Sequence, residues 1–261
     1  MTPRTGGAGS VVPFGDGKRG TVALTSEQEW ILVGCGLIAH ADEILDIGEW
    51  DEVLRYVGSA LSEQDQLIWM DVLSHQEQLE RRFMELGPVA DEAKQEDVLR
   101  RCWQMALADG TGSDVEATVH DRIARRLGVD LEKVARWRDA WTQQAHARAE
   151  LAVGLAAVFV NLDGHLDFHE AIHFDNLLER LPIPVGRRVE LSELLHKPPA
   201  IESLVERLLA LDLGERVKAL HSLVPILRAS RRGGRERELF FELSRKVLGS
   251  QTEVEQLLSN S

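Results

Sequence analysis

A short phrase recurs along this chain, Asp-x-x-x-(Asp/Ser)-x-x-Glu, each time between two apolar stretches with helical spacing. The copies are Asp42…Asp46…Glu49, Asp109…Ser113…Glu116 and Asp163…Asp167…Glu170. The second half of each copy fits a capping box, in which an Asp or Ser side chain accepts from the N–H three residues on and the Glu reaches back to the cap's own N–H. The repeated unit is therefore predicted to be helix, tight acidic corner, helix.

The remaining pattern is helical as well. No segment shows sustained period-two alternation bounded by hairpin turns, so we predict an all-α fold. Pro182, Pro184, Pro198 and Pro199 are expected to divide the second half into shorter helices. The expected elements include a first helix capped at Ser26, one helix over 62–86, a polar linker over 88–95, a helix capped at Asp130, a helical connector over 142–149, a helix over 217–227, and a last long helix stopping at Gly249 before a short tail helix.

The spacing of the phrases indicates a duplication. Asp42 and Asp109 are 67 residues apart, as are Asp163 and Ser230. Ser230 begins a fourth copy that matches the phrase less well. The two pairs are offset by 121 residues, and a fixed period with matched start and stop residues is typical of a repeat. We expect a disordered leader over 1–24 and two similar domains over 25–145 and 150–261, each with two related helix-corner-helix halves.

Composition narrows the classes of function. The net charge of −13 argues against nonspecific binding to nucleic acid or to an anionic membrane. No run of 18 apolar residues and no signal-peptide core is present, which favours a cytoplasmic protein without membrane insertion. The two cysteines, Cys35 and Cys102, each precede a corner Asp by seven residues. We interpret them as small core residues rather than a redox pair.

Two segments carry a family resemblance. Met105–Val129, with Asp109-Gly110 and Leu127-Gly128, resembles the TerB family, a tellurite-resistance-associated helical domain, and the segment 159–170 is similar. The resemblance implies tandem all-helical domains that are not enzymes and that are linked to stress response, metal ions and protein scaffolding. The chain departs from the pattern where Glu43 follows Asp42, and where Ser230 and two arginines replace Asp-Gly.

The acidic corners are candidate sites for a divalent cation such as Ca²⁺. The candidate carboxylates are Asp42, Asp46, Glu49, Asp109, Glu116, Asp163, Asp167 and Glu170. Ca²⁺ takes six to eight oxygen ligands, and the EF-hand spacing is absent. The alternative is that these side chains only turn the chain and cap the following helices.

His169-Glu170-Ala171-Ile172-His173 matches the H-E-x-x-H pattern of zinc metalloproteases. Two histidines at i and i+4 share a helix face, and the Glu would activate a zinc-bound water. Glu190 or Glu193 is available as a third ligand. Against a protease, Glu170 is already expected in a capping box at the start of its helix, and no strands are expected to hold a peptide.

Two further groups favour contact with proteins. Trp137 and Trp141 are one helical turn apart and form either a docking ridge or part of the core. A basic run from Arg228 to Arg237 is either a solvated face or a contact for an acidic partner. We therefore expect a non-enzymatic interaction or scaffold protein with an unidentified protein partner; the alternative is a zinc-dependent hydrolase using His169, Glu170 and His173.

Overall fold

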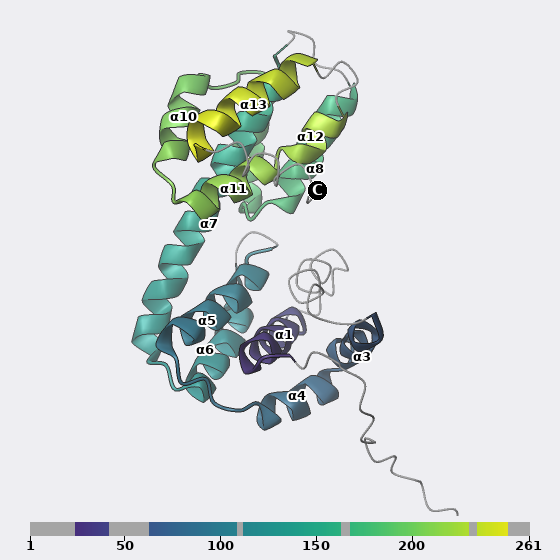
Figure 1. Cartoon of the computed structure of the whole chain (residues 1–261), viewed down its shortest axis with the longest axis vertical. Coiled ribbons are helices and arrows are strands. Elements are labelled where there is room, and N and C mark those ends of the chain that lie inside the picture. Colours follow the sequence, from purple (N-terminus) through teal and green to yellow (C-terminus); the bar gives the residue numbers. More distant parts are fainter. Residues whose placement is uncertain (1–23, 42–62, 109–111, 163–167, 230–233, 250–261) are drawn as a thin grey trace, which may run out of the picture.

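The computed structural model describes residues 24–41, 63–108, 112–162, 168–229 and 234–249. Within these ranges the chain is helical between short connections and contains no strand (Figure 1), so the all-α prediction is confirmed. The expected leader, the tail helix, and the corners at 42–49 and 163–167 lie outside the described residues. None of the described helices combines the length and the hydropathy needed to cross a bilayer.

The helices are α1 Ser26–Ala39, α3 Glu63–Leu73, α4 Gln76–Glu85, α5 Glu92–Ala106, α6 Asp114–Leu127, α7 Leu131–Val160, α8 Phe168–Arg180, α9 Val185–Ser192, α10 Ile201–Leu209, α11 Leu213–His221, α12 Val224–Ala229 and α13 Gly234–Leu248, with a 3₁₀ helix η1 at Glu193–Leu195. The connector expected over 142–149 is helical. It is continuous with the elements on both sides, so that α7 is a single helix of 30 residues.

The apolar side chains form two separate cores that share α7. The first core extends from Trp30 to Ala145 and the second from Ala149 to Leu248. In the first, α1 is buried on all sides from Trp30 to Ala39 and is surrounded by α4, α5 and α6. In the second, the C-terminal half of α7 takes the central position, against α8, α10 and α11 (Figure 1).

Small residues let these two central helices approach their neighbours closely. A Cβ added at Gly34 of α1 would lie 2.4 Å from Sγ of Cys102 on α5. A Cβ added at Gly154 of α7 would lie 2.9 Å from Cδ2 of Leu204 on α10. Both distances are shorter than van der Waals contact, so each helix pair is packed to the limit that glycine allows.

Several helix boundaries differ from the sequence prediction. α1 is capped by Thr25, not Ser26: Oγ1 of Thr25 accepts from the N–H of Gln28, and Oε1 of Gln28 accepts from the N–H of Thr25. The expected linker over 88–95 is also too long. Asp91 accepts from the N–H groups of Ala93 and Lys94, and α5 starts directly after it.

Two expected helices are each divided in two. The helix expected over 62–86 is interrupted between α3 and α4, where Ser74 donates to the carbonyl of Met70 and His75 bonds that of Asp71. These side chains compete with the helix for its own carbonyls. The helix expected over 217–227 is interrupted between α11 and α12. Pro225 lacks an N–H, and its ring would clash with the carbonyl of His221 in a continuous helix.

Candidate functional site

The predicted metal ligands are only partly within the described residues. Asp42, Asp46, Glu49, Asp109, Asp163 and Asp167 lie outside them. Glu116, His169, Glu170 and His173 are described. Across the described ranges, no three His, Cys, Asp or Glu side chains are grouped closely enough to hold a metal ion.

Glu116 has the structural role that the capping box predicted. Its Oε2 accepts from the N–H of Ser113 at 2.6 Å, while Oγ of Ser113 accepts from the N–H of Glu116 at 3.2 Å. The Glu116 side chain is buried, whereas Asp114, in the same first turn of α6, is exposed. The two carboxylates therefore point to different environments, and Glu116 fixes the start of α6.

The H-E-x-x-H residues lie at the beginning of α8. Glu170 is in the first helical turn and is buried, His169 is exposed, and His173 is half-buried. A zinc-bound water would need Glu170 beside an open metal position, together with a third ligand. Neither Glu190 nor Glu193 joins the two histidines in a group of ligands within the described chain.

A buried polar cluster around His120 was not anticipated from the sequence. His120 is fully buried on α6, and its Nε2 donates to the carbonyl of Leu99 at 2.8 Å. Nη1 of Arg138 lies 3.4 Å from Nδ1 of His120 and also pairs with Asp121. Burial lowers the pKa of His120 to about 4, against an opposing effect of the hydrogen bond to Leu99. The imidazole is therefore neutral at pH 7.

Tryptophans close this cluster. The rings of Trp103 and Trp141 both meet the His120 ring edge-on, and Trp137 stacks on Trp141 with 5.6 Å between centroids. Trp141 is buried and Trp137 is half-buried, with Nζ of Lys133 4.6 Å from the Trp137 ring centroid. The pair was expected to be either a docking ridge or part of the core. Trp141 is part of the core, whereas Trp137 is partly exposed to solvent.

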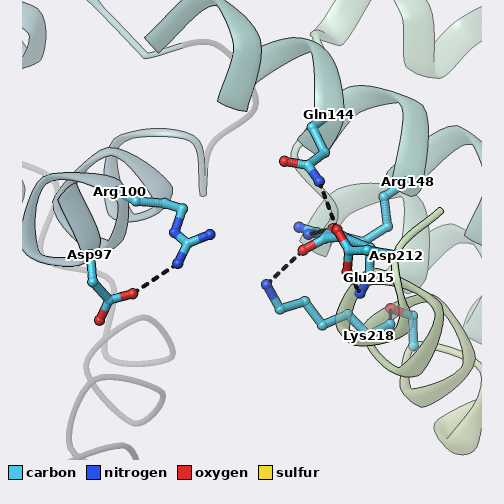
Figure 2. Close-up of polar contacts among 8 residues, drawn as sticks. Asp97, Arg100, Gln144, Arg148, Asp212, Glu215 and Lys218 are labelled. Atoms are coloured by element: carbon cyan, nitrogen blue, oxygen red, sulfur yellow. Dashed lines mark hydrogen bonds and ion pairs between the residues drawn. The ribbon is translucent and has the colours of Figure 1, made fainter. Parts of the chain in front are cut away.

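A second polar cluster joins α7 to α11. Figure 2 shows Gln144 directed at Asp212, and Arg148 and Lys218 both directed at Glu215. Burial alone would raise the pKa of Glu215, but Lys218 and Arg148 outweigh it, and the pKa is lowered. The carboxylate is therefore ionised and fixes the middle of α7 to the second core.

The two cysteines are buried in the first core and form no disulfide with each other. The hydrogen bond with Cys35, followed by burial, raises the pKa of the Cys102 thiol well above its usual value. Because the thiolate is the reactive form, this thiol is poorly suited to nucleophilic or redox chemistry. The prediction of two small core residues is confirmed.

Comparison with known proteins gives one family. The family described as Tellurite resistance protein TerB matches residues 28–139, which include most of α1, all of α3 to α6 and the beginning of α7. No curated protein and no solved structure matches the chain. The expected resemblance is thus confirmed for the first half, and residues 28–139 form a TerB family domain.

Proposed function

We propose that the chain is a tandem TerB-like scaffold, with the second TerB-like domain built by α7 to α13, and that it binds partner proteins rather than catalysing a reaction. The observation that carries the tandem arrangement is a set of polar contacts around the second core. They repeat those of the TerB domain at an offset of 120 to 122 residues.

Helix caps supply the first set of matching contacts. Asp91 caps α5, and Asp212, 121 residues later, caps α11 by accepting from the N–H of Glu215. Gly128 ends α6 and Gly249 follows α13, and both have φ of +79°. Left-handed residues at helix ends are usually glycine because other residues are strained there. The corresponding helices therefore begin and end at matching positions.

Side chains that bond distant carbonyls supply the second set. His40 at the end of α1 donates to the carbonyl of Leu73 at 2.8 Å, and Asn161 at the end of α7 donates to that of Leu195 at 2.8 Å. Gln95 donates to the carbonyl of Leu127 at 3.1 Å, and Arg216 donates to that of Val247 at 2.9 Å. In each case different side chains make the same connection.

An ion pair supplies the third match, with its charges exchanged. In the first domain Glu27 of α1 pairs with Lys94 of α5 at 3.5 Å. The residues 121 positions later are Arg148 of α7 and Glu215 of α11, which also pair. Both charges are reversed between the two pairs, yet the attraction between the two positions is preserved. This supports a common arrangement of the helices that carry them.

A scaffold is the function that this arrangement supports best. The buried polar side chains described above bond backbone groups or one another, and α7, which is about 45 Å long, runs through both cores. Such a molecule can present two similar surfaces at once. A role in a tellurite or related stress response, in the cytoplasm, is proposed from the TerB match and the composition.

The test is to capture partners with the intact protein from cells grown with and without tellurite, followed by cross-linking mass spectrometry. We expect cross-links from both cores to the same partner or complex. Turnover of small model substrates by the purified protein, with no captured partner, would contradict the scaffold role.

A divalent cation bound at the acidic corners is proposed as a modulator of the scaffold. His169 and His173, one turn apart beside the buried Glu170, are the candidate ligands of the zinc alternative. Metal analysis of the purified protein and of His173→Ala separates the cases. Stoichiometric zinc that is lost in the variant favours the hydrolase alternative. A melting temperature raised by millimolar Ca²⁺, with the rise abolished in Asp163→Asn, favours a corner cation.

A further inference from the structure

The solvent face of α3 is apolar, which is unusual for a helix at the edge of a domain. Leu67, Ile68 and Met70 are exposed, and Leu67 exposes 72% of its surface. Asp71 follows them, and its Oδ1 lies 3.5 Å from Nδ1 of His75, the residue before α4. Adjacent exposed apolar residues are rare on solvated helices and mark contact surfaces. We call Leu67, Ile68, Met70 and Asp71 the α3 face.

The domain that carries the α3 face is acidic as a whole. Residues 25–145 carry 25 of the 43 acidic side chains of the chain but only 12 of its 30 basic ones. The whole net charge of −13 therefore resides in the first domain, while residues 146–261 are nearly balanced with 17 acidic and 15 basic side chains. A partner for the α3 face should be basic and should carry an exposed apolar group.

The second domain presents a surface of that description on α13. Arg237, Phe241 and Arg245 follow one another at intervals of four residues, so they form one stripe along the helix. All three are exposed. Lys246 lies beside the stripe, as do the exposed Glu238 and Glu242, so basic side chains exceed acidic ones on this side of α13. Opposite this stripe, Phe240, Leu243 and Val247 fill the second core. We call Arg237, Phe241 and Arg245 the α13 face.

The two faces cannot meet within one chain. Figure 1 shows α3 in the lower unit and α13 in the upper unit, separated by the continuous helix α7. We propose that the α3 face of one copy binds the α13 face of a second copy. Phe241 packs among Leu67, Ile68 and Met70, while Arg237 and Arg245 meet acidic residues such as Asp71. This extends the scaffold role from a partner protein to self-assembly.

Such a contact joins unlike surfaces, so each copy keeps one face open and assembly continues head to tail. Sedimentation velocity of the intact protein should show an average mass that rises above 29.2 kDa with concentration. Raising the ionic strength should reduce the association, because the pairs at the rim of the contact are screened. A monomer at all concentrations in low salt would overturn the proposal.

Single-face variants locate the contact. Leu67→Glu adds a charge to the α3 face, and the double variant Arg237→Glu/Arg245→Glu reverses the charge of the α13 face. Because all three side chains are exposed, we expect native helix content by circular dichroism, and a monomer for each variant alone. Matched controls outside both faces, Val115→Glu and Arg125→Glu/Arg136→Glu, should assemble like the unmodified chain.

Mixing the two single-face variants is the decisive measurement. Each variant keeps the face that the other lacks, so an equimolar mixture should form a dimer of twice the chain mass and nothing larger. If the mixture remains monomeric, or if either variant assembles alone, the proposed contact is wrong. No partner protein enters these experiments, so their failure leaves the capture experiment as a separate test of the scaffold role.

Discussion

At the scale of single residues, polar side chains in the described structure mainly satisfy backbone groups that helices leave open. Arg126 donates to the carbonyls of Phe83 and Met84 at the end of α4, as His40 does at the end of α3. The last carbonyls of a helix have no partner within it. His40 and Arg126 therefore have structural roles at these helix ends.

His120 should make stability depend on pH. Its pKa of about 4 in the folded protein is below its ordinary value of 6.5, so the unfolded state binds the proton more readily. Neutral His120 therefore contributes about 3 kcal/mol to the free energy of unfolding above pH 6.5, and this contribution is lost as the pH falls toward 4. Urea unfolding at pH 7 and pH 4.5 should show a smaller loss for His120→Gln than for the unmodified protein. A ring titration near pH 6.5 by NMR would contradict this.

Gly112 should tolerate alanine poorly. Its φ is +61°, and an added Cβ would lie 2.7 Å from the ring of Trp103. We expect Gly112→Ala to lower the free energy of unfolding by about 2 kcal/mol, through left-handed strain and the clash. Gly128→Ala is the control, since Gly128 has φ of +79° with no atom within 4 Å, and should cost only about 1 kcal/mol. If both variants lower the urea midpoint by the same amount, the contact with Trp103 is unimportant.

At the scale of elements, local signals were predictable and interruptions were not. The capping box at Ser113 and Glu116 and the stop at Gly249 depend on neighbouring residues, so the sequence predicted them correctly. The break at Ser74 depends on a side chain that donates to a carbonyl which a backbone N–H would bond in a continuous helix, and the apolar periodicity continues through the break. The His120 cluster joins α5, α6 and α7, and no short-range pattern signals it.

The exchanged ion pair predicts a specific rescue. Arg148→Glu places two carboxylates together in a mostly buried position, and should lower the free energy of unfolding by about 2 kcal/mol or more. Adding Glu215→Lys and Lys218→Asp copies Glu27, Lys94 and Asp97 of the first domain. This triple variant should recover at least half of the loss in chemical unfolding. No recovery would mean that the two pairs occupy different environments.

At the scale of the whole molecule, the offset of 121 residues predicts two equivalent sets of helices, and the tandem arrangement stays a proposal. The sequence also placed a helical connector over 142–149. It did not indicate that α7 belongs to both cores, because one helix can end one hydrophobic pattern and begin another without a break. The change occurs between Ala145 and Ala149, and Ala147 is exposed at this junction.

Proline at this junction should therefore uncouple the two cores without unfolding either. In Ala147→Pro the N–H that bonds the carbonyl of Gln143 is lost and the ring clashes with that carbonyl, which kinks the helix. Proline is well tolerated at the start of a helix, so the part of α7 that enters the second core can remain. Small-angle scattering should show a changed distance distribution, while circular dichroism keeps nearly all of the helix signal. Ala147→Gly removes no hydrogen bond and should leave the scattering curve unchanged; a profile for Ala147→Pro identical to that of the glycine variant would show that α7 does not set the separation of the cores.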